Sequence, residues 1–308
     1  MSAQGSVDLS VQIGPLHLTN PVLAASGTFG YGIEFAELVD LDRLGGFVTK
    51  GLSLKPMEGA PAPRLCETPS GMLNAVGLQN VGVEAFVREK LPGLRKFRTH
   101  VIANIFGESI SDYAEVTRHL EGAEGVSAYE VNVSCPNTDA GGMLFGCDPQ
   151  ETAKVVSATR AVTKKPLWVK LTPNVTDIRI IVRAAEEAGA DAFTVANTYP
   201  AMSVDYKTRK SRLGRPTGGL SGPAIRPITV RLVSEVAGVT KLPIIGLGGI
   251  ESGEDVMEYL VVGATATQVG TATFADPRAC ERIIDEVLEL CTASKVSTIN
   301  SLRGTLVR

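Results

Sequence analysis

The sequence predicts an α/β protein whose strands close into a (β/α)8 barrel, the TIM barrel. Eight short apolar runs alternate with amphipathic helical stretches along almost the whole chain. Most of the runs are continuously apolar, which is typical of strands buried on both faces of a parallel sheet. The alternative is a doubly wound open sheet, but the chain lacks the glycine fingerprint that follows the first strand of that fold. The expected strands are 22–26, 46–51, 101–106, 128–134, 167–171, 192–196, 243–248 and 266–270.

The segments between these strands carry the apolar spacing of amphipathic helices. Several begin with residues that favour helix N-termini, such as Ser109 or Ser111, Asp148, Asp177 and Asp276. The expected helices are 111–120, 149–162, 177–188, 227–236, 253–261 and 277–290. Because no linker or repeat interrupts this order, we expect residues 1–308 to form one domain.

Three segments depart from a plain alternation of strand and helix. Residues 9–19 precede the first strand and read as an N-terminal β-hairpin that plugs the opposite end of the barrel. Residues 52–91, after the second strand, and 198–225, after the sixth, are too long for ordinary connections. Both follow the carboxyl ends of strands, so we expect these two insertions on the catalytic face.

Charge and composition exclude several classes of protein. Lys and Arg number 30 against 33 Asp and Glu, so the net charge of −3 offers no footprint for nucleic acid or an anionic membrane. No apolar run is long enough to span a membrane and no signal peptide opens the chain, so a cytoplasmic location is expected. The five cysteines form no C-x-x-C pair and the three histidines are scattered. We therefore expect no metal or iron–sulfur cluster on this chain.

Polar side chains follow the predicted strands at the end where barrels carry their chemistry. None of them is a carboxylate or a histidine, which excludes paired-carboxylate glycoside hydrolysis and a histidine-based triad. These strand-end residues are Ser26, Lys50, Asn104, Asn132, Cys135, Lys170, Asn197 and Thr198.

Two glycine turns favour a phosphate site. Gly248-Gly249 and Gly270-Thr271 follow the seventh and eighth strands, where barrels often bind phosphate through backbone N–H groups. Gly222, directly before a helix, adds a third possible wall. The alternative is that these residues only make tight turns.

Lys50 and Lys170 each end an apolar strand, where a cation needs a partner. A flavin provides one, since its reduction places negative charge along the N1–C2=O edge. A structural ion pair and a Schiff-base aldolase are the alternatives. The amides of four asparagines suit a polar heterocycle that carries amide groups and a carboxylate, although any one of them can equally be a turn residue. They are Asn74, Asn104, Asn132 and Asn197.

Cys135 stands directly before Pro136, which ends the fourth strand and exposes the thiol at the rim. We interpret this thiol as a general base or nucleophile, with inert packing as the alternative. The glycine-containing segment 138–147 follows and is expected to be a lid that excludes water. The basic run 207–215 is interpreted as a solvated loop, with contact to a partner as the alternative.

In this order, the motifs resemble the catalytic subunit of a dihydroorotate dehydrogenase over essentially the whole chain. The carriers are NPV at 20–22, ASGTFG at 25–30, TKG at 49–51, NAVGLQN at 74–80, NVSCPN at 132–137, KLTP at 170–173, ANT at 196–198, GLSG at 219–222, GGI at 248–250 and VGT at 269–271. The resemblance implies one FMN per chain and oxidation of dihydroorotate to orotate in pyrimidine biosynthesis. It also implies Cys135 as the base, with flavin N5 accepting the hydride.

The resemblance carries site residues onto matching positions of this chain. Those for the flavin are Ser26, Lys50, Gly51, Asn104, Asn132, Lys170, Val195, Gly222, Gly248, Gly249, Gly270 and Thr271. Those for the substrate are Lys50, Asn74, Ala75, Val76, Gly77, Leu78, Asn132, Asn197 and Thr198.

With a cysteine as the expected base, the chain resembles the soluble class 1 of the family. The stretch 26–32 and the opening hairpin resemble those of the NAD-linked 1B type within that class. That type implies a homodimer of this chain bound to an iron–sulfur flavoprotein, a heterotetramer in which FAD and a 2Fe–2S cluster lie only on the partner subunit. The fumarate-reducing homodimeric type is the alternative within the family. A non-catalytic FMN-binding subunit, which would not need Cys135, is an alternative of another class.

Overall fold

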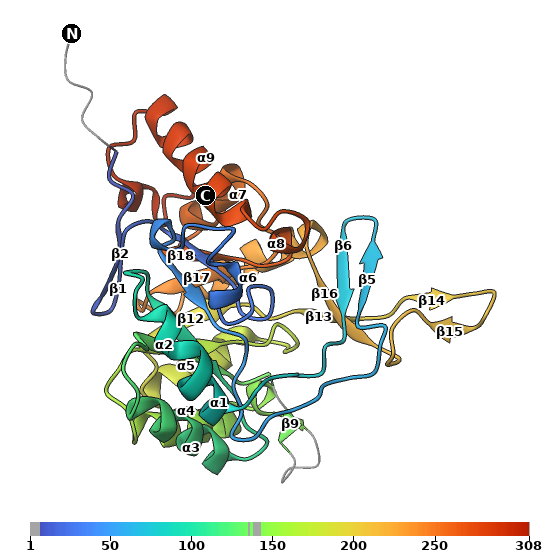
Figure 1. Cartoon of the computed structure of the whole chain (residues 1–308). Helices are drawn as coiled ribbons and strands as arrows, with labels where there is room; N and C mark the ends of the chain where they lie inside the picture. The colour runs from blue at the N-terminus through green and yellow to red at the C-terminus, as the bar shows by residue number, and fades with distance from the viewer. Residues whose placement is uncertain (1–6, 135, 138–142, 308) are drawn as a thin grey trace.

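The computed structural model describes residues 7–134, 136–137 and 143–307, and its centre is a closed barrel of eight parallel strands (Figure 1). The barrel closes where the last strand pairs in parallel with the first. Each strand lies within one of the eight expected segments, so the predicted (β/α)8 barrel is confirmed. The strands are β3 (Val22–Ala24), β4 (Gly46–Val48), β7 (Val101–Ile105), β8 (Ala128–Asn132), β11 (Leu167–Lys170), β12 (Ala192–Val195), β17 (Ile244–Leu247) and β18 (Ala266–Val269).

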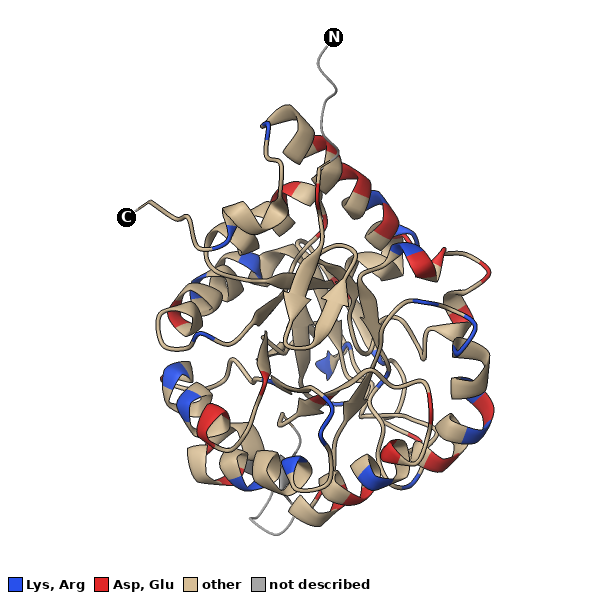
Figure 2. Cartoon of the chain, turned by 90° about the vertical axis from the view of Figure 1, so that its left-hand side faces the viewer, with Lys and Arg blue, Asp and Glu red and all other residues tan. Residues whose placement is uncertain are grey.

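Helices surround the barrel and carry most of the charged side chains on its outside (Figure 2). The longer ones are α3 (Ile110–Glu121), α4 (Pro149–Arg160), α5 (Ile178–Glu187), α6 (Arg226–Ala237), α7 (Gly253–Val261) and α9 (Ala279–Ala293). The shorter ones are α1 (Val83–Ala85), the π-helix η3 (Phe86–Lys90), α2 (Leu91–Leu94) and α8 (Ala272–Ala275). Single 3-10 turns are η1 (Ile33–Phe35), η2 (Leu41–Arg43), η4 (Phe145–Cys147), η5 (Pro223–Ile225) and η6 (Ile299–Leu302).

Local capping explains where several helices begin. Ser109 and Asp112 form a capping box at the start of α3, and the carboxylates of Asp148 and Asp177 accept from backbone N–H groups of α4 and α5. The helix expected from residue 277 begins at Ala279 instead. Asp276 accepts a hydrogen bond from the N–H of Arg278, so these residues form a turn before the helix.

The two long insertions fold together into one antiparallel sheet in the order β13-β16-β6-β5. Its strands β5 (Leu65–Thr68) and β6 (Gly71–Asn74) come from the first insertion, while β13 (Tyr199–Ala201) and β16 (Gly218–Ser221) come from the second. The ribbon of β14 (Val204–Asp205) and β15 (Lys210–Ser211) projects beyond this sheet and carries the exposed basic run (Figure 1). The sheet lies beside the barrel, so segments far apart in sequence form one wall.

The predicted N-terminal hairpin is present as β1 (Val11–Ile13) and β2 (Leu16–Leu18). It lies at the opposite end of the barrel from the insertion sheet (Figure 1). Val11, Ile13 and Leu18 are buried in the main hydrophobic core, which explains how the hairpin is held in place. None of the helices in the described ranges has the length and apolar character needed to cross a membrane.

Gly246 on β17 provides a test of how tightly the barrel packs against α7. A methyl group there would lie 2.3 Å from the ring of Tyr259, which is fully buried and donates a hydrogen bond to the carbonyl of Gly248. We expect Gly246→Ala to lower the free energy of unfolding by about 1–3 kcal/mol, measured by urea denaturation. Gly122→Ala is the control, because its new methyl group meets no atom closer than 3.8 Å. Equal stability of the two variants would contradict this account of the packing.

Candidate active site

A cavity of about 340 Å³ lies between the carboxyl ends of the barrel strands and the insertion sheet. That volume is within the range of small-molecule sites. The structure brings 17 of the predicted site residues to its walls. They are Ser26, Lys50, Gly51, Asn74, Ala75, Val76, Gly77, Leu78, Asn104, Asn132, Lys170, Asn197, Thr198, Gly248, Gly249, Gly270 and Thr271.

Two predicted site residues that the structure describes are not among the residues that line this cavity. Val195 is fully buried at the end of β12, and its neighbour Ala196 lines the cavity. Gly222 lies behind the wall, since a methyl group at Gly249 would be 2.7 Å from the carbonyl oxygen of Gly222. Cys135 and residues 138–142 of the expected lid lie outside the described residues, so their roles stay predictions.

The cavity has further walls that sequence reasoning did not name. Half of the polar and large apolar ones come from the insertions, whose fold cannot be read from the ends of the barrel strands. The sequence offered one signal, because Ser221 directly precedes the predicted Gly222. In the structure, the Ser221 hydroxyl accepts a hydrogen bond from Thr271 at 2.8 Å. The additional polar and large apolar lining residues are Thr28, Leu65, Met72, Gln79, Phe106, Ser134, Ser221, Ile225, Leu247 and Phe274.

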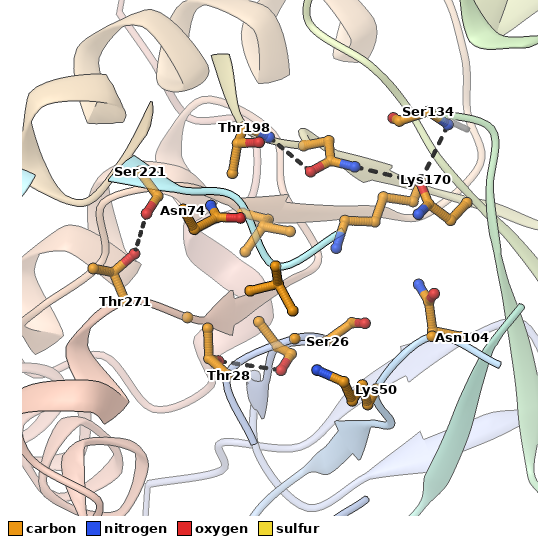
Figure 3. Close-up of a pocket in the computed structure, with 18 of the residues that line it drawn as sticks. Ser26, Thr28, Lys50, Asn74, Asn104, Ser134, Lys170, Thr198, Ser221 and Thr271 are labelled. Carbon is orange, nitrogen blue, oxygen red and sulfur yellow. Dashed lines mark hydrogen bonds between the residues drawn. The ribbon is translucent and has the colours of Figure 1, made fainter. Parts of the chain in front are cut away.

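Lys50, which follows β4, and Lys170, which ends β11, reach into the same space (Figure 3). Burial lowers the pKa of Lys50, and the nearby positive charge of Arg64 lowers it further. Within the described ranges, Lys50 forms no ion pair with a carboxylate. Lys170 differs, because its ammonium nitrogen lies 3.7 Å from a carboxylate oxygen of Glu130. The ion-pair interpretation therefore applies to Lys170, although Lys170 also lines the cavity.

Hydrogen bonds fix the orientation of the asparagine amides. The Asn74 amide donates to the carbonyl of Gly219 at 3.1 Å, across the register of β6 and β16. The Asn197 amide donates to Asn132 Oδ1 at 3.3 Å, and its own oxygen accepts from the N–H of Thr198 at 2.8 Å (Figure 3). These amides are therefore positioned before any ligand arrives, as recognition of a flat polar ring requires.

The glycine turn after β17 is shaped for close approach of a ligand to the backbone. Gly248 and Gly249 have φ of 149° and 68°, conformations that side chains disfavour. Tyr259 holds the turn from below through its hydrogen bond of 2.7 Å to the Gly248 carbonyl. The turn thus presents backbone rather than side chains to the cavity.

The cavity contrasts with a metal centre in its chemistry. In the part of the chain that the structure describes, no group of three or more histidine, cysteine or acidic side chains is arranged to hold a metal ion. The groups that line the cavity are instead two ammonium groups, four asparagines and glycine backbone. This set suits an anionic ligand with a polar heterocyclic ring.

Comparison with known proteins agrees with this chemistry. Residues 8–291 match the family described as dihydroorotate dehydrogenase. The chain is 52% identical to the catalytic subunit of dihydroorotate dehydrogenase B (NAD+) of Trichlorobacter lovleyi and 49% identical to that of Citrifermentans bemidjiense. It is 53% identical to a Solibacter usitatus protein provisionally named dihydroorotate dehydrogenase A (fumarate). Each match covers 97% of this chain and 98% of the relative. The chain belongs to the dihydroorotate dehydrogenase family, as its motifs indicated.

Proposed function

We propose that this chain oxidises dihydroorotate to orotate in pyrimidine biosynthesis, as the FMN-containing catalytic subunit of an NAD-linked dihydroorotate dehydrogenase. The observation that carries the proposal is the joint placement of two lysines, four asparagines and two glycine turns around one cavity in a chain of this family. Several relatives that match nearly the whole chain are named as catalytic subunits of the NAD+ type. We propose one domain and a cytoplasmic location for it.

The family uses FMN, and the residues present fit it. Gly248 and Gly249 let backbone N–H groups approach a phosphate, and a methyl group at Gly249 would collide with the backbone of Gly222 and Arg226. Gly51 leaves room for a flat ring, since a methyl group there would lie 3.0 Å from Asn104 Oδ1 and from Phe106. Lys50 and Lys170 provide positive charge. When bound, FMN supplies the acceptor for the hydride that leaves C6 of dihydroorotate.

The other groups of the chain hold the substrate and take its proton. Lys50 and the oriented amides of Asn74 and Asn197 match the carboxylate and ring amides of dihydroorotate. Cys135, as thiolate, would remove the proton from C5 while a hydride leaves C6, so the C5–C6 single bond becomes a double bond. The apolar walls Phe106 and Leu78 would limit the access of water to these groups.

Electrons must then leave the reduced cofactor. The chain has no recognisable dinucleotide fingerprint of its own. We therefore propose a partner subunit that carries FAD and a 2Fe–2S cluster and binds NAD+, joined to a homodimer of this chain as a heterotetramer. The fumarate-reducing homodimer is the second candidate, favoured by the 53% identity to the Solibacter usitatus protein.

One anaerobic titration tests the reaction. We expect the purified chain to be yellow with bound FMN and to lose its visible flavin absorbance when dihydroorotate is added. A colourless protein that binds no added FMN would contradict the proposal and favour a Schiff-base aldolase, for which Lys50 with its lowered pKa is the candidate. A yellow protein that dihydroorotate does not bleach would indicate a non-catalytic flavin subunit.

The same reduced sample then tests the acceptor. We expect artificial dyes to restore the colour of the isolated chain, whereas NAD+ should restore it only after the iron–sulfur flavoprotein subunit is added. Fumarate is the control acceptor. Rapid recovery of colour with fumarate, and no gain from the partner, would assign the chain to the homodimeric type.

Cys135 can be tested through the pH dependence of flavin reduction. Only the thiolate accepts a proton, so the rate should rise with pH until the thiol, with an ordinary pKa of about 8.5, is ionised. We expect Cys135→Ser to slow reduction about a hundredfold or more at neutral pH and to leave orotate binding nearly intact. Cys66→Ser is the control, because Cys66 is not among the residues that line the cavity. Unchanged reduction kinetics in Cys135→Ser would remove Cys135 from the mechanism.

Lys50 should make orotate binding depend on pH. Its pKa is lowered by burial, so it loses its charge at a lower pH than an exposed lysine. Affinity for the anionic product should hold at neutral pH and fall as the pH rises through this lowered value. We would measure this in protein that also carries Cys135→Ser, so that the Cys135 thiolate does not contribute. There, Lys50→Met should weaken orotate binding about ten- to a hundredfold and remove this pH dependence. Exposed Lys55, replaced by Met, is the control, and equal effects of the two changes would contradict the assignment.

A further inference from the structure

A carboxylate that the proposed reaction does not use lies directly below the cavity. Glu130 on β8 is fully buried inside the barrel. Its Oε1 accepts a hydrogen bond of 2.7 Å from the Asn104 amide, and its Oε2 accepts from Thr194 at 2.8 Å and from Gln268 at 2.7 Å. With Lys170 at 3.7 Å, donors from four other strands converge on this one carboxylate.

Two of these partners also line the cavity, and both approach the same oxygen atom. Asn104 and Lys170 each contact Glu130 Oε1 and each face the predicted flavin site. Because the Asn104 amide nitrogen is bound to Glu130, its oxygen is turned toward Gly51, another wall of the cavity. Glu130 therefore fixes which atom of Asn104 is presented and compensates the charge of Lys170.

We propose that Glu130 is a positioning residue that tunes the electron affinity of bound FMN through Lys170 and Asn104, an inference that rests on the proposed function. A negative charge behind Lys170 reduces the positive potential that this lysine projects into the cavity. Reduction adds negative charge to the flavin, so Glu130 disfavours the reduced form. Removing its charge should make the flavin easier to reduce.

The chain offers a variant that keeps the shape of the network. Glu130→Gln has the same size, and Gln268 Oε1 is buried without a hydrogen-bond partner among the described residues. The Gln268 amide can therefore reverse and accept from the new amide, so Gln268 keeps its hydrogen bond to residue 130 and still has one polar atom without a partner among the described residues. The change removes the negative charge while the packing is retained.

Glu121 provides a matched control. Its carboxylate accepts from Tyr129 at 2.7 Å and from Thr163 at 2.8 Å, and it lies 3.6 Å from the ammonium group of Lys165. This arrangement resembles that of Glu130, but none of its members lines the cavity. Glu121→Gln should therefore change stability without changing the flavin.

The first measurement is the midpoint potential of FMN on the purified protein, by equilibrium titration against reference dyes. We expect Glu130→Gln to strengthen binding of reduced relative to oxidised FMN about tenfold, which for a two-electron couple raises the potential by about 30 mV. Glu121→Gln should leave the potential at the wild-type value. An unchanged potential in Glu130→Gln, or an equal shift in Glu121→Gln, would overturn the proposal.

The second measurement needs no flavin and is independent of the proposed reaction. In flavin-free protein, Glu130→Gln and Lys170→Gln should each lower the thermal midpoint, because each leaves one buried charge unpaired. The thermal midpoint of the double variant should fall by less than the sum of the two single decreases. The double variant should also fold even where Glu130→Gln alone does not. Strictly additive losses would show that Glu130 and Lys170 are not coupled and would overturn the proposal. If the chain binds no FMN, the proposed function is contradicted. The comparison of single and double variants would still show whether Glu130 and Lys170 are coupled.

Discussion

The ion pair of Lys170 and Glu130 lies at the level where the packed interior of the barrel ends and its cavity begins. A lysine at the end of an apolar strand is costly unless an opposite charge is near. The carboxylate that provides it is itself held by Asn104, Thr194 and Gln268 from three other strands. The network that ties these strands together is thus the same network that sets the charge at the floor of the cavity.

The opposite wall depends on pairing between segments that are nearly 150 residues apart. Gly219 on β16 pairs with Asn74 on β6, and this contact is possible only because β16 carries glycines at the crossing. A methyl group at Gly218, for example, would lie 2.6 Å from the carbonyl oxygen of Asn74. Under the proposed function, the barrel would therefore supply charge and cofactor contacts, while the insertions on this rigid scaffold would add groups that recognise the substrate.

Local patterns were enough to predict the barrel, but not the sheet beside it. Most barrel strands are largely apolar runs buried on both faces, so eight runs and their helices could be read directly. The insertion strands have two to four residues of mixed character, and the pairing of β6 with β16 that joins the two insertions links segments distant in sequence. Glu130 was missed for another reason. It does not lie at a strand end, because strand alternation places Glu130 on the same side as Asn132 but one layer deeper.

The relatives of this chain include proteins named for either of two electron acceptors. Proteins named for NAD+ and one provisionally named for fumarate match the chain almost equally, at 52% and 53% identity over the same length. Oxidation of the substrate needs only the cavity, which lies within the part that all of them share. Under the proposed function, an electron-transfer partner would relay electrons to NAD+ outside the barrel, whereas fumarate would have to reach the flavin itself to accept a hydride. Whole-chain identity therefore does not by itself distinguish the two acceptor types.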